Sequence, residues 1–244
     1  MRIAAIADVH GNLGALDAVL TDIATRKVDL VVNLGDCLSG PLLPAESADR
    51  LIPLALPTIR GNHERQLLTL HSEQMGPSDR YTASRIKQEH LQWMADLPET
   101  SSPVDGVLLV HGTPQSDADY FLETVDEGEL RPASIDEVER RAGPTPARLI
   151  LCGHSHLQRS IKLRDGRMVV NPGSVGLQAY DAVHPQPHKV ESGSPHARYA
   201  IVQKRNHQWS VELIAIVYDW ERMAQLAQQQ GRADWATALR TGRL

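Results

Sequence analysis

Short apolar runs alternate with segments of helical periodicity through the first two thirds of the chain. Residues 13–25 carry apolar side chains at helical spacing, between two runs that have the length of a strand. Strand, helix and strand in this order predict a parallel βαβ unit. Further buried strands are expected wherever a short apolar run recurs, and the full set of predicted strands is 2–7, 28–34, 57–60, 107–110 and 148–152.

After residue 156 the pattern changes to strand following strand. Asp165-Gly166 is a strong two-residue turn signal and predicts a hairpin of residues 159–164 and 167–170. A second antiparallel pair is expected at 199–203 and 209–217, around a turn at Asn206-His207. Residues 220–239 are predicted to be helical.

Three other segments are read from their composition. Residues 64–97 have a mostly helical pattern that breaks at residues 76–78. Residues 115–147 are acidic at first and helical from about residue 134 to 141, and they are predicted to be a helical insertion over one edge of the site. The segment 180–197 is rich in Pro, His and Gly, so an exposed, mobile loop is expected there, with His184, His188 and His196 in solvent. Residues 1–244 are predicted to form a single domain with this insertion.

Bulk composition excludes several classes of protein. The 244 residues are 41% hydrophobic and 23% charged, which is ordinary for a globular protein and argues against a disordered or fibrous one. The net charge of −5 gives no attraction to a phosphate backbone, so no stable nucleic-acid partner is expected. No apolar run approaches the roughly 20 residues that cross a bilayer, so no membrane association is expected.

Cys37 and Cys152 are expected to be reduced thiols in a cytoplasmic protein.

Potential metal ligands gather where the predicted strands end. Carboxylate, amide and imidazole groups follow five of these strands, and this mixture suits a pair of divalent ions better than one tetrahedral zinc. Asp36 is the natural bridge, because each of its two carboxylate oxygens can hold one ion. The residues at these strand ends are Asp8, His10, Asp36, Asn62, His63, His111, His154 and His156.

Each strand-end motif has a plain structural alternative when it is taken alone. Asp8 could cap the next helix, and Asn62 and Glu64 could simply begin one. Two histidines after a buried strand, as in Gly153-His154-Ser155-His156, have no common structural purpose. The shared position of all the motifs at strand ends favours a metal site. Two cations about 3.5–4 Å apart would hold a water or hydroxide in line with phosphorus and let it attack at neutral pH.

The strand-end motifs resemble those of the calcineurin-like metallophosphoesterases, and the segment 171–175 is similar to the small prokaryotic phosphodiesterase branch. The resemblance implies an α/β fold, a four-layer α/β/β/α sandwich of two mixed sheets flanked by helices. It implies one metal bound by Asp8, His10, Asp36 and His156, and another bound by Asp36, Asn62, His111 and His154. It also implies a catalytic pair in which Asn62 faces the metal and His63 contacts phosphate or protonates the leaving group.

The function expected from this resemblance is a dinuclear metal-dependent phosphoesterase, more specifically a phosphodiesterase, in which a metal-bridging hydroxide attacks a small organic phosphate ester. Manganese is expected first, with Fe, Co, Ni or Zn as further candidates. One alternative is a protein Ser/Thr phosphatase or a diadenosine tetraphosphatase. Those enzymes carry Asp-Arg-Gly after the Gly-Asp motif, whereas Gly35-Asp36 is followed by residues 37–40 without an arginine. An alternative of another class is a noncatalytic scaffold on the same fold.

Three further residues keep two interpretations each. Arg60 is a candidate phosphate contact, although an arginine at a strand end more often pairs with surface carboxylates. Tyr120 and Phe121 could line the leaving-group pocket or could anchor the insertion to the core. The sequence leaves open the physiological substrate and the oligomeric state.

Overall fold

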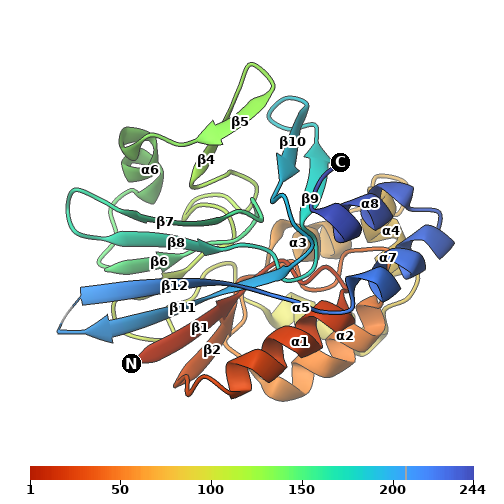
Figure 1. Ribbon diagram of the computed structural model, residues 1–244, viewed down its shortest axis with the longest axis horizontal. Helices are drawn as coiled ribbons and strands as arrows, with labels where there is room; N and C mark the ends of the chain where they lie inside the picture. The colour runs from red at the N-terminus through yellow and green to blue at the C-terminus, as the bar shows by residue number, and fades with distance from the viewer. Residues whose placement is uncertain (207) are drawn as a thin grey trace.

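The structure is a computed structural model that describes residues 1–206 and 208–244 (Figure 1). The predicted turn at Asn206-His207 therefore includes one residue, His207, that lies outside the described part. Within the described residues two four-stranded sheets lie at the centre of the fold, in the orders β12-β11-β1-β2 and β3-β6-β8-β7. Each sheet combines parallel and antiparallel pairs, so both are mixed.

The strands confirm most of the predicted apolar runs, with boundaries that differ by a few residues. The first sheet contains β1 (Arg2–Ile6), β2 (Leu30–Asn33), β11 (Ala197–Arg205) and β12 (Gln208–Ile216). The second sheet contains β3 (Val107–Leu109), β6 (Leu149–Leu151), β7 (Gln158–Lys162) and β8 (Met168–Pro172). Residues 57–60 do not form the predicted strand and make only an isolated bridge between Thr58 and Asn33.

Alternation of side chains along β1 explains why the sheets stack. Ile3 and Ala5 face a core shared with Val107, Leu149 and other residues of the second sheet. Ala4 and Ile6 point the opposite way, toward helices. A strand whose two faces are both apolar must be covered on both sides, and this requirement places the first sheet between the helices and the second sheet.

Helices close the outer faces of the two sheets. The first sheet packs on α1 (Leu13–Ala24) through one apolar cluster. In the same cluster α2 (Pro44–Leu51) and α7 (Trp220–Gln229) pack on α1, and α8 (Ala233–Thr241) packs on α7. The second sheet packs on α6 (Ile135–Ala142) through another. The fold is thus the expected four-layer α/β/β/α sandwich, as Figure 1 shows. Shorter helices are η1 (Ile52–Leu54), α3 (Asn62–Thr69), α4 (Pro77–Ala83) and α5 (Gln88–Asp96).

The helix predicted in the second half of the insertion at 115–147 is confirmed, but its acidic first half contains a hairpin that was not predicted. Its first half forms the hairpin of β4 (Glu123–Asp126) and β5 (Glu129–Pro132), and α6 follows. Glu127 and Gly128 both have positive φ, 51° and 83°, which is the geometry of a tight hairpin turn. Acidic residues around this turn obscure the alternation of apolar and polar positions that would have predicted the hairpin.

The segment 180–197 is also more ordered than the exposed loop that was predicted. It contains most of a hairpin of β9 (Ala179–Ala182) and β10 (His188–Glu191). His184 is exposed as expected, but His188 is 5% exposed, because its ring packs against Tyr120. The C-terminal helix is divided at Gly231, where φ is +76°, into α7 and α8. No helix among the described residues combines the length and the apolar character needed to cross a membrane.

Candidate metal centre

The predicted ligands lie together at the carboxyl ends of the parallel strands. Asp8 and His10 follow β1, Asp36 follows β2, and His111 follows β3. The two remaining histidines follow β6. Five of these side chains stand on residues with left-handed backbone, at φ between 51° and 68°, namely Asp8, His10, Asp36, His154 and His156.

Left-handed backbone at a residue other than glycine costs of order 1–3 kcal/mol and persists only where surrounding bonds enforce it. Here the backbone N–H groups of Asp8 and His10 donate to carbonyls of the β2 loop, at Gly35 and Asp36, over 3.0 Å each. The strand-end loops therefore hold one another. Strain concentrated at five predicted ligands indicates a functional site, because it serves no purpose in packing.

Glu64 and Gly61 join the loop of Asp36 to α3. The buried Glu64 carboxylate accepts from the backbone N–H groups of Asp36, Cys37 and Gly61 at 2.7–2.8 Å. A Cβ on Gly61 would lie 2.3 Å from Oδ1 of Asp36, so only glycine allows this approach. Glu64 thus lies at the start of a helix, which was the structural interpretation of this motif, and it also fixes the position of Asp36.

The donor atoms fall into two groups that meet at Asp36. One group is Asp8, His10 and His156, and the other is Asp36, His111 and His154, with all donor atoms of a group within 4.8 Å of one another. Oδ1 of Asn62 lies 3.1 Å from Nε2 of His111, on the side of the second group. Oδ2 of Asp36 lies 3.1 Å from Nε2 of His111 and 4.0 Å from Nε2 of His10. This oxygen therefore lies between the groups, where a bridging ligand would have to be.

The first group has an arrangement that calls for a cation. Nδ1 of His10 is 2.7 Å from the carbonyl of Ser39, and Nδ1 of His156 is 2.7 Å from that of Leu177, so both Nδ1 atoms carry the proton. The two Nε2 atoms then face each other at 3.1 Å with lone pairs and no hydrogen between them. Burial lowers the pKa of His10 to about 4, which excludes a proton there near neutral pH. A metal ion would resolve this contact, and a carbonyl on the far nitrogen is the usual support of a metal-binding histidine.

The second group uses both kinds of imidazole nitrogen. Nδ1 of His111 is 2.7 Å from the carbonyl of Leu34, which leaves Nε2 facing the site. His154 uses its two ring nitrogens the other way round. Its Nε2 is 2.9 Å from the carbonyl of Ala118, which leaves the lone pair of Nδ1 available to a metal. His154 and His156, with Ser155 between them in the sequence, therefore lie in different groups of donors, as the resemblance implied.

Electrostatics of the carboxylates also fit bound cations. Oδ2 of Asp8 is buried and has no hydrogen-bond partner among the described residues. Burial, only partly offset by His111, raises the pKa of Asp8 to about 8. Burial alone would raise the pKa of Asp36 too, but His111 and His63 hold it well below the ordinary value. An orphaned buried oxygen among imidazole lone pairs fits a divalent ion, which would supply the missing partner.

His63 faces the cavity beside these groups without belonging to either. Its Nδ1 is 2.8 Å from Oδ1 of Asp79, a buried residue in the first turn of α4 that also accepts from Oγ of Ser39. Although burial would lower the pKa of His63, the carboxylates of Asp36 and Asp79 raise it to about 9. Asp79 was not predicted from the sequence, because an acidic residue in the first turn of a helix is common without any function.

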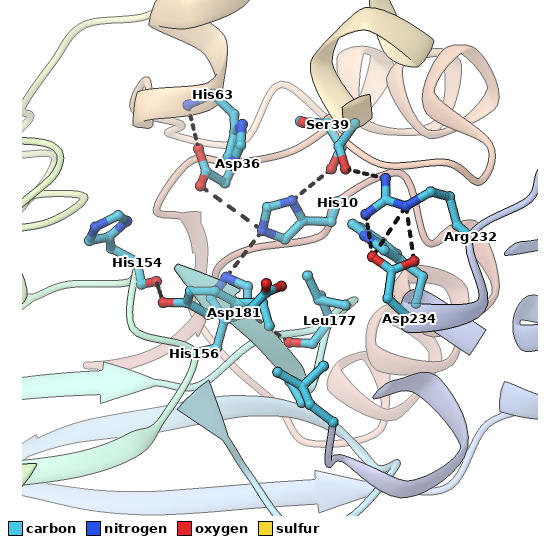
Figure 2. A pocket seen from close by; sticks show the side chains of 15 residues that line it. His10, Asp36, Ser39, His63, His154, His156, Leu177, Asp181, Arg232 and Asp234 are labelled. Atoms are coloured by element: carbon cyan, nitrogen blue, oxygen red, sulfur yellow. Dashed lines mark hydrogen bonds and ion pairs between the residues drawn. The ribbon is translucent and has the colours of Figure 1, made fainter. Parts of the chain in front are cut away.

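A cavity of about 190 Å³ opens onto both groups of donors. Figure 2 shows His154 and Asp36 on one side of His10, and Arg232 and Asp234 on the other. Arg232, Asp234 and Trp235 come from the start of α8, far along the chain. They were missed because nothing local marks them. The other lining residues that the sequence analysis missed are Ser39, Ser78, Leu177, Ala179, Tyr180, Asp181 and Leu244.

Tyr120 and Phe121 anchor the insertion, which is one of their two predicted roles. Phe121 is 2% exposed in the apolar cluster under α6. Tyr120 lies with its ring centroid 5.1 Å from that of His154, and its hydroxyl is 2.9 Å from the hydroxyl of Tyr180 and 2.8 Å from Nε2 of His188. The hydroxyl of Tyr180 in turn donates to the carbonyl of His154 at 3.0 Å. The insertion and the β9–β10 hairpin thereby support the second group of donors.

Arg60 pairs with a surface carboxylate, which was the structural one of its two interpretations. Its Nη2 donates to Oε1 of Glu99 at 2.8 Å, and Glu99 is exposed. Arg60 is not among the described residues that line the cavity. Its predicted contact with phosphate therefore gains no support from the structure.

Comparison with known proteins agrees with this geometry. The chain is 25% identical over 255 residues to an uncharacterized protein of Methanocaldococcus jannaschii, covering 96% of this chain and 94% of that one. A crystal structure of a metallophosphoesterase from Sphaerobacter thermophilus is 26% identical and covers 99% of both chains with a TM-score of 0.73. A hypothetical protein of Pyrococcus horikoshii OT3 shares the fold, with a TM-score of 0.79 over 99% and 98% of the chains at 18% identity. A family model of the calcineurin-like phosphoesterase superfamily domain matches residues 1–187, and the chain belongs to this superfamily.

Proposed function

We propose that the chain is a phosphoesterase that uses two divalent ions to hydrolyse a small organic phosphate ester, foremost a phosphodiester. One observation carries the proposal: two groups of donors, with five of the six side chains buried, lie on either side of Oδ2 of Asp36 in a cavity that His63 also lines. Asp8, His10, Asp36 and His156 would hold one ion, and Asp36, Asn62, His111 and His154 the other. When bound, the ions would neutralise charge on the phosphate oxygens and would lower the pKa of a water, which is the chemistry that hydrolysis of the ester needs.

The chain's own residues then hold the substrate and move the proton. Nδ1 of His63 is engaged by Asp79, so its Nε2 is the atom available to the cavity. From Nε2, His63 donates a proton to the oxygen of the departing alcohol, which would otherwise leave as a strongly basic alkoxide. Asp79 keeps the imidazole in this orientation through a bond of 2.8 Å. The backbone N–H of His63 donates to Oδ1 of Asp36 at 3.0 Å and sets the distance between acid and metal centre.

The test is turnover of a model diester and the matching monoester by metal-stripped protein, re-supplied with Mn, Fe, Co, Ni or Zn in turn. We expect no turnover without metal, recovery with Mn and a preference for the diester. Metal analysis is the second measurement, with two ions per chain expected. Less than one tightly bound divalent ion per chain after Mn²⁺ supplementation, together with no turnover, would favour the noncatalytic scaffold.

A further inference from the structure

The wall of the cavity opposite the metal donors is built by the end of the chain. Arg232, Asp234 and Trp235 line it together with Ser78 of α4. The match to the superfamily ends at residue 187, so the residues from α8 lie outside the matched segment. Figure 2 shows Arg232 and Asp234 beyond His10 as seen from His154. Whatever substituent the reacting phosphate carries on this side must meet these residues.

Arg232 is fixed in place before any ligand binds. Its Nε and Nη2 donate to the Asp234 carboxylate at 3.0 and 2.6 Å, and its Nη1 donates to Oγ of Ser78 at 3.0 Å. Its guanidinium carbon lies 5.7 Å from the ring centroid of Trp235. A guanidinium has five N–H groups. Three are used by these contacts, and two remain without a partner among the described residues. A donor held in this way loses little entropy when it binds.

Charge decides what those two donors can recognise. Asp234 neutralises Arg232, and Asp181 lines the same cavity with a second carboxylate. An additional phosphate or carboxylate on the substrate would meet two negative side chains and one paired positive one. An uncharged oxygen, such as a hydroxyl, accepts from Arg232 without that repulsion.

Size and position restrict the ligand further. A cavity of about 190 Å³ is smaller than the roughly 300–1,000 Å³ of sites for drug-sized ligands. Ser78 precedes Asp79, which holds His63, so this wall lies beside the group proposed to protonate the departing alcohol. The departing alcohol is therefore the part of the substrate that Arg232 can reach.

We infer that Arg232 is a specificity-determining residue that selects a small, uncharged, hydroxyl-bearing leaving alcohol, of the size of glycerol, on the phosphate ester. The inference rests on the proposed function. It excludes long polyphosphate substrates, because their charge and size both conflict with this wall.

The experiment compares methyl glyceryl phosphate with methyl propyl phosphate, two diesters whose leaving alcohols differ by two hydroxyl groups. We expect the ratio of their kcat/KM values to be about tenfold higher in the Mn²⁺-loaded wild type than in Arg232→Met, as the loss of hydrogen bonds to one side chain predicts. Taking the ratio between variants removes the intrinsic reactivity of the two esters. Arg240→Met is the matched control, because Arg240 also lies on α8 but pairs with Glu221 at the surface, and it should leave the ratio unchanged.

A measurement without turnover supports the same comparison. Calorimetric binding of (3,4-dihydroxybutyl)methylphosphinate and butylmethylphosphinate, in which P–C bonds replace the ester bonds and cannot be hydrolysed, should show the same wild-type preference and its loss in Arg232→Met. If Arg232→Met does not fold, as judged by circular dichroism, Ser78→Ala decides, because it frees the guanidinium while leaving α8 intact. We expect a loss of about threefold in the ratio there, since one of three partners of the guanidinium is removed.

The outcomes separate this inference from the proposed function. Equal ratios in the wild type and Arg232→Met, or faster cleavage of an ester whose alcohol carries a second phosphate, would overturn the role of Arg232 while hydrolysis itself persists. Failure of the wild type to cleave even methyl p-nitrophenyl phosphate with every metal would overturn the proposed function, and the inference with it.

Discussion

The two walls of the cavity are built in opposite ways. The metal-donor wall consists of loops that follow buried strands, and its residues are held by backbone hydrogen bonds and left-handed backbone. The opposite wall consists of side chains from α4, β9 and α8, held by contacts between side chains such as Arg232 with Asp234 and Ser78. The first wall is rigid because each loop fixes the next, while the second depends on pairs that one substitution can remove.

This difference predicts a division of roles. The rigid wall fits the invariant part of the reaction, in which ions and phosphate must keep one geometry. The other wall meets the variable part of the substrate. Substitutions on the first wall should therefore abolish metal binding and turnover, and those on the second should change selectivity while metal binding persists.

The largest effect is expected at Asp36, where the two groups of donors meet. Asp36→Asn keeps the shape of the side chain but removes the charge that both ions would share. We expect metal analysis to fall from two ions per chain to fewer than one, with a loss of kcat/KM of more than about 10⁴-fold, as losing several kcal/mol of metal stabilisation implies. Asp136→Asn, an exposed carboxylate that pairs with Arg164, is the control. Two retained ions in Asp36→Asn would show that Asp36 is not the bridge.

The next effect is expected at His63, which lines the cavity without joining either donor group. His63→Ala should retain both ions and lose about 10²–10⁴-fold in turnover, the usual range for a general acid. The loss should be large for an alkyl ester and small for a nitrophenyl ester, because a good leaving group needs no proton. His71→Ala, an exposed histidine just after α3, should change neither rate. Equal losses with both esters would assign His63 to phosphate binding and not to proton donation.

The sequence predicted the residues of the metal-donor wall and missed those of the opposite wall. Each predicted ligand lies within a few residues of an apolar run, so a local pattern was sufficient to find it. Asp8 and His10 after residues 2–7 are typical. The imidazole nitrogens that face the site were not predictable, because they depend on the carbonyls of Ala118 and Leu177, which only the fold brings there.

The opposite wall has no local signal. Arg232 lies 76 residues after His156, the last predicted ligand, and it reaches the cavity only because α8 packs on α7, on β9 and on the loop of Gly40. A Cβ on Gly40 would lie 2.7 Å from the indole of Trp235, so the close packing of α8 depends on that glycine. The two hairpins at 123–132 and 179–191 were missed for another reason, since their polar faces hid a short alternation.

A smaller effect is expected at Asp79, which lies between the walls. Asp79→Ala should lower the turnover of an alkyl ester by about 10–100-fold, because the imidazole of His63 loses the bond that orients it. Asp79→Asn should recover most of this loss, since its amide oxygen can still accept from Nδ1. In a His63→Ala background Asp79→Ala should have no further effect on turnover. An undiminished loss in that background would show that Asp79 acts through the fold and not through His63.

The smallest effect is expected at Tyr120, which supports the metal-donor wall from outside. Tyr120→Phe keeps the ring against His154 but removes the hydroxyl that joins Tyr180 and His188. Because Tyr180 still donates to the carbonyl of His154, the affinity for the more weakly bound ion should fall by only about tenfold, at the low end for groups that support metal ligands. Competition with a chelator measures that affinity, and Tyr81→Phe, whose hydroxyl donates at 3.3 Å to the carbonyl of Leu42, is the control. Unchanged affinity would mean that backbone bonds of the strand-end loops alone hold His154. The metal-donor wall would then depend on no hydrogen bond of the Tyr120 hydroxyl, and the two walls would differ more than the hydrogen bonds of Tyr120 suggest.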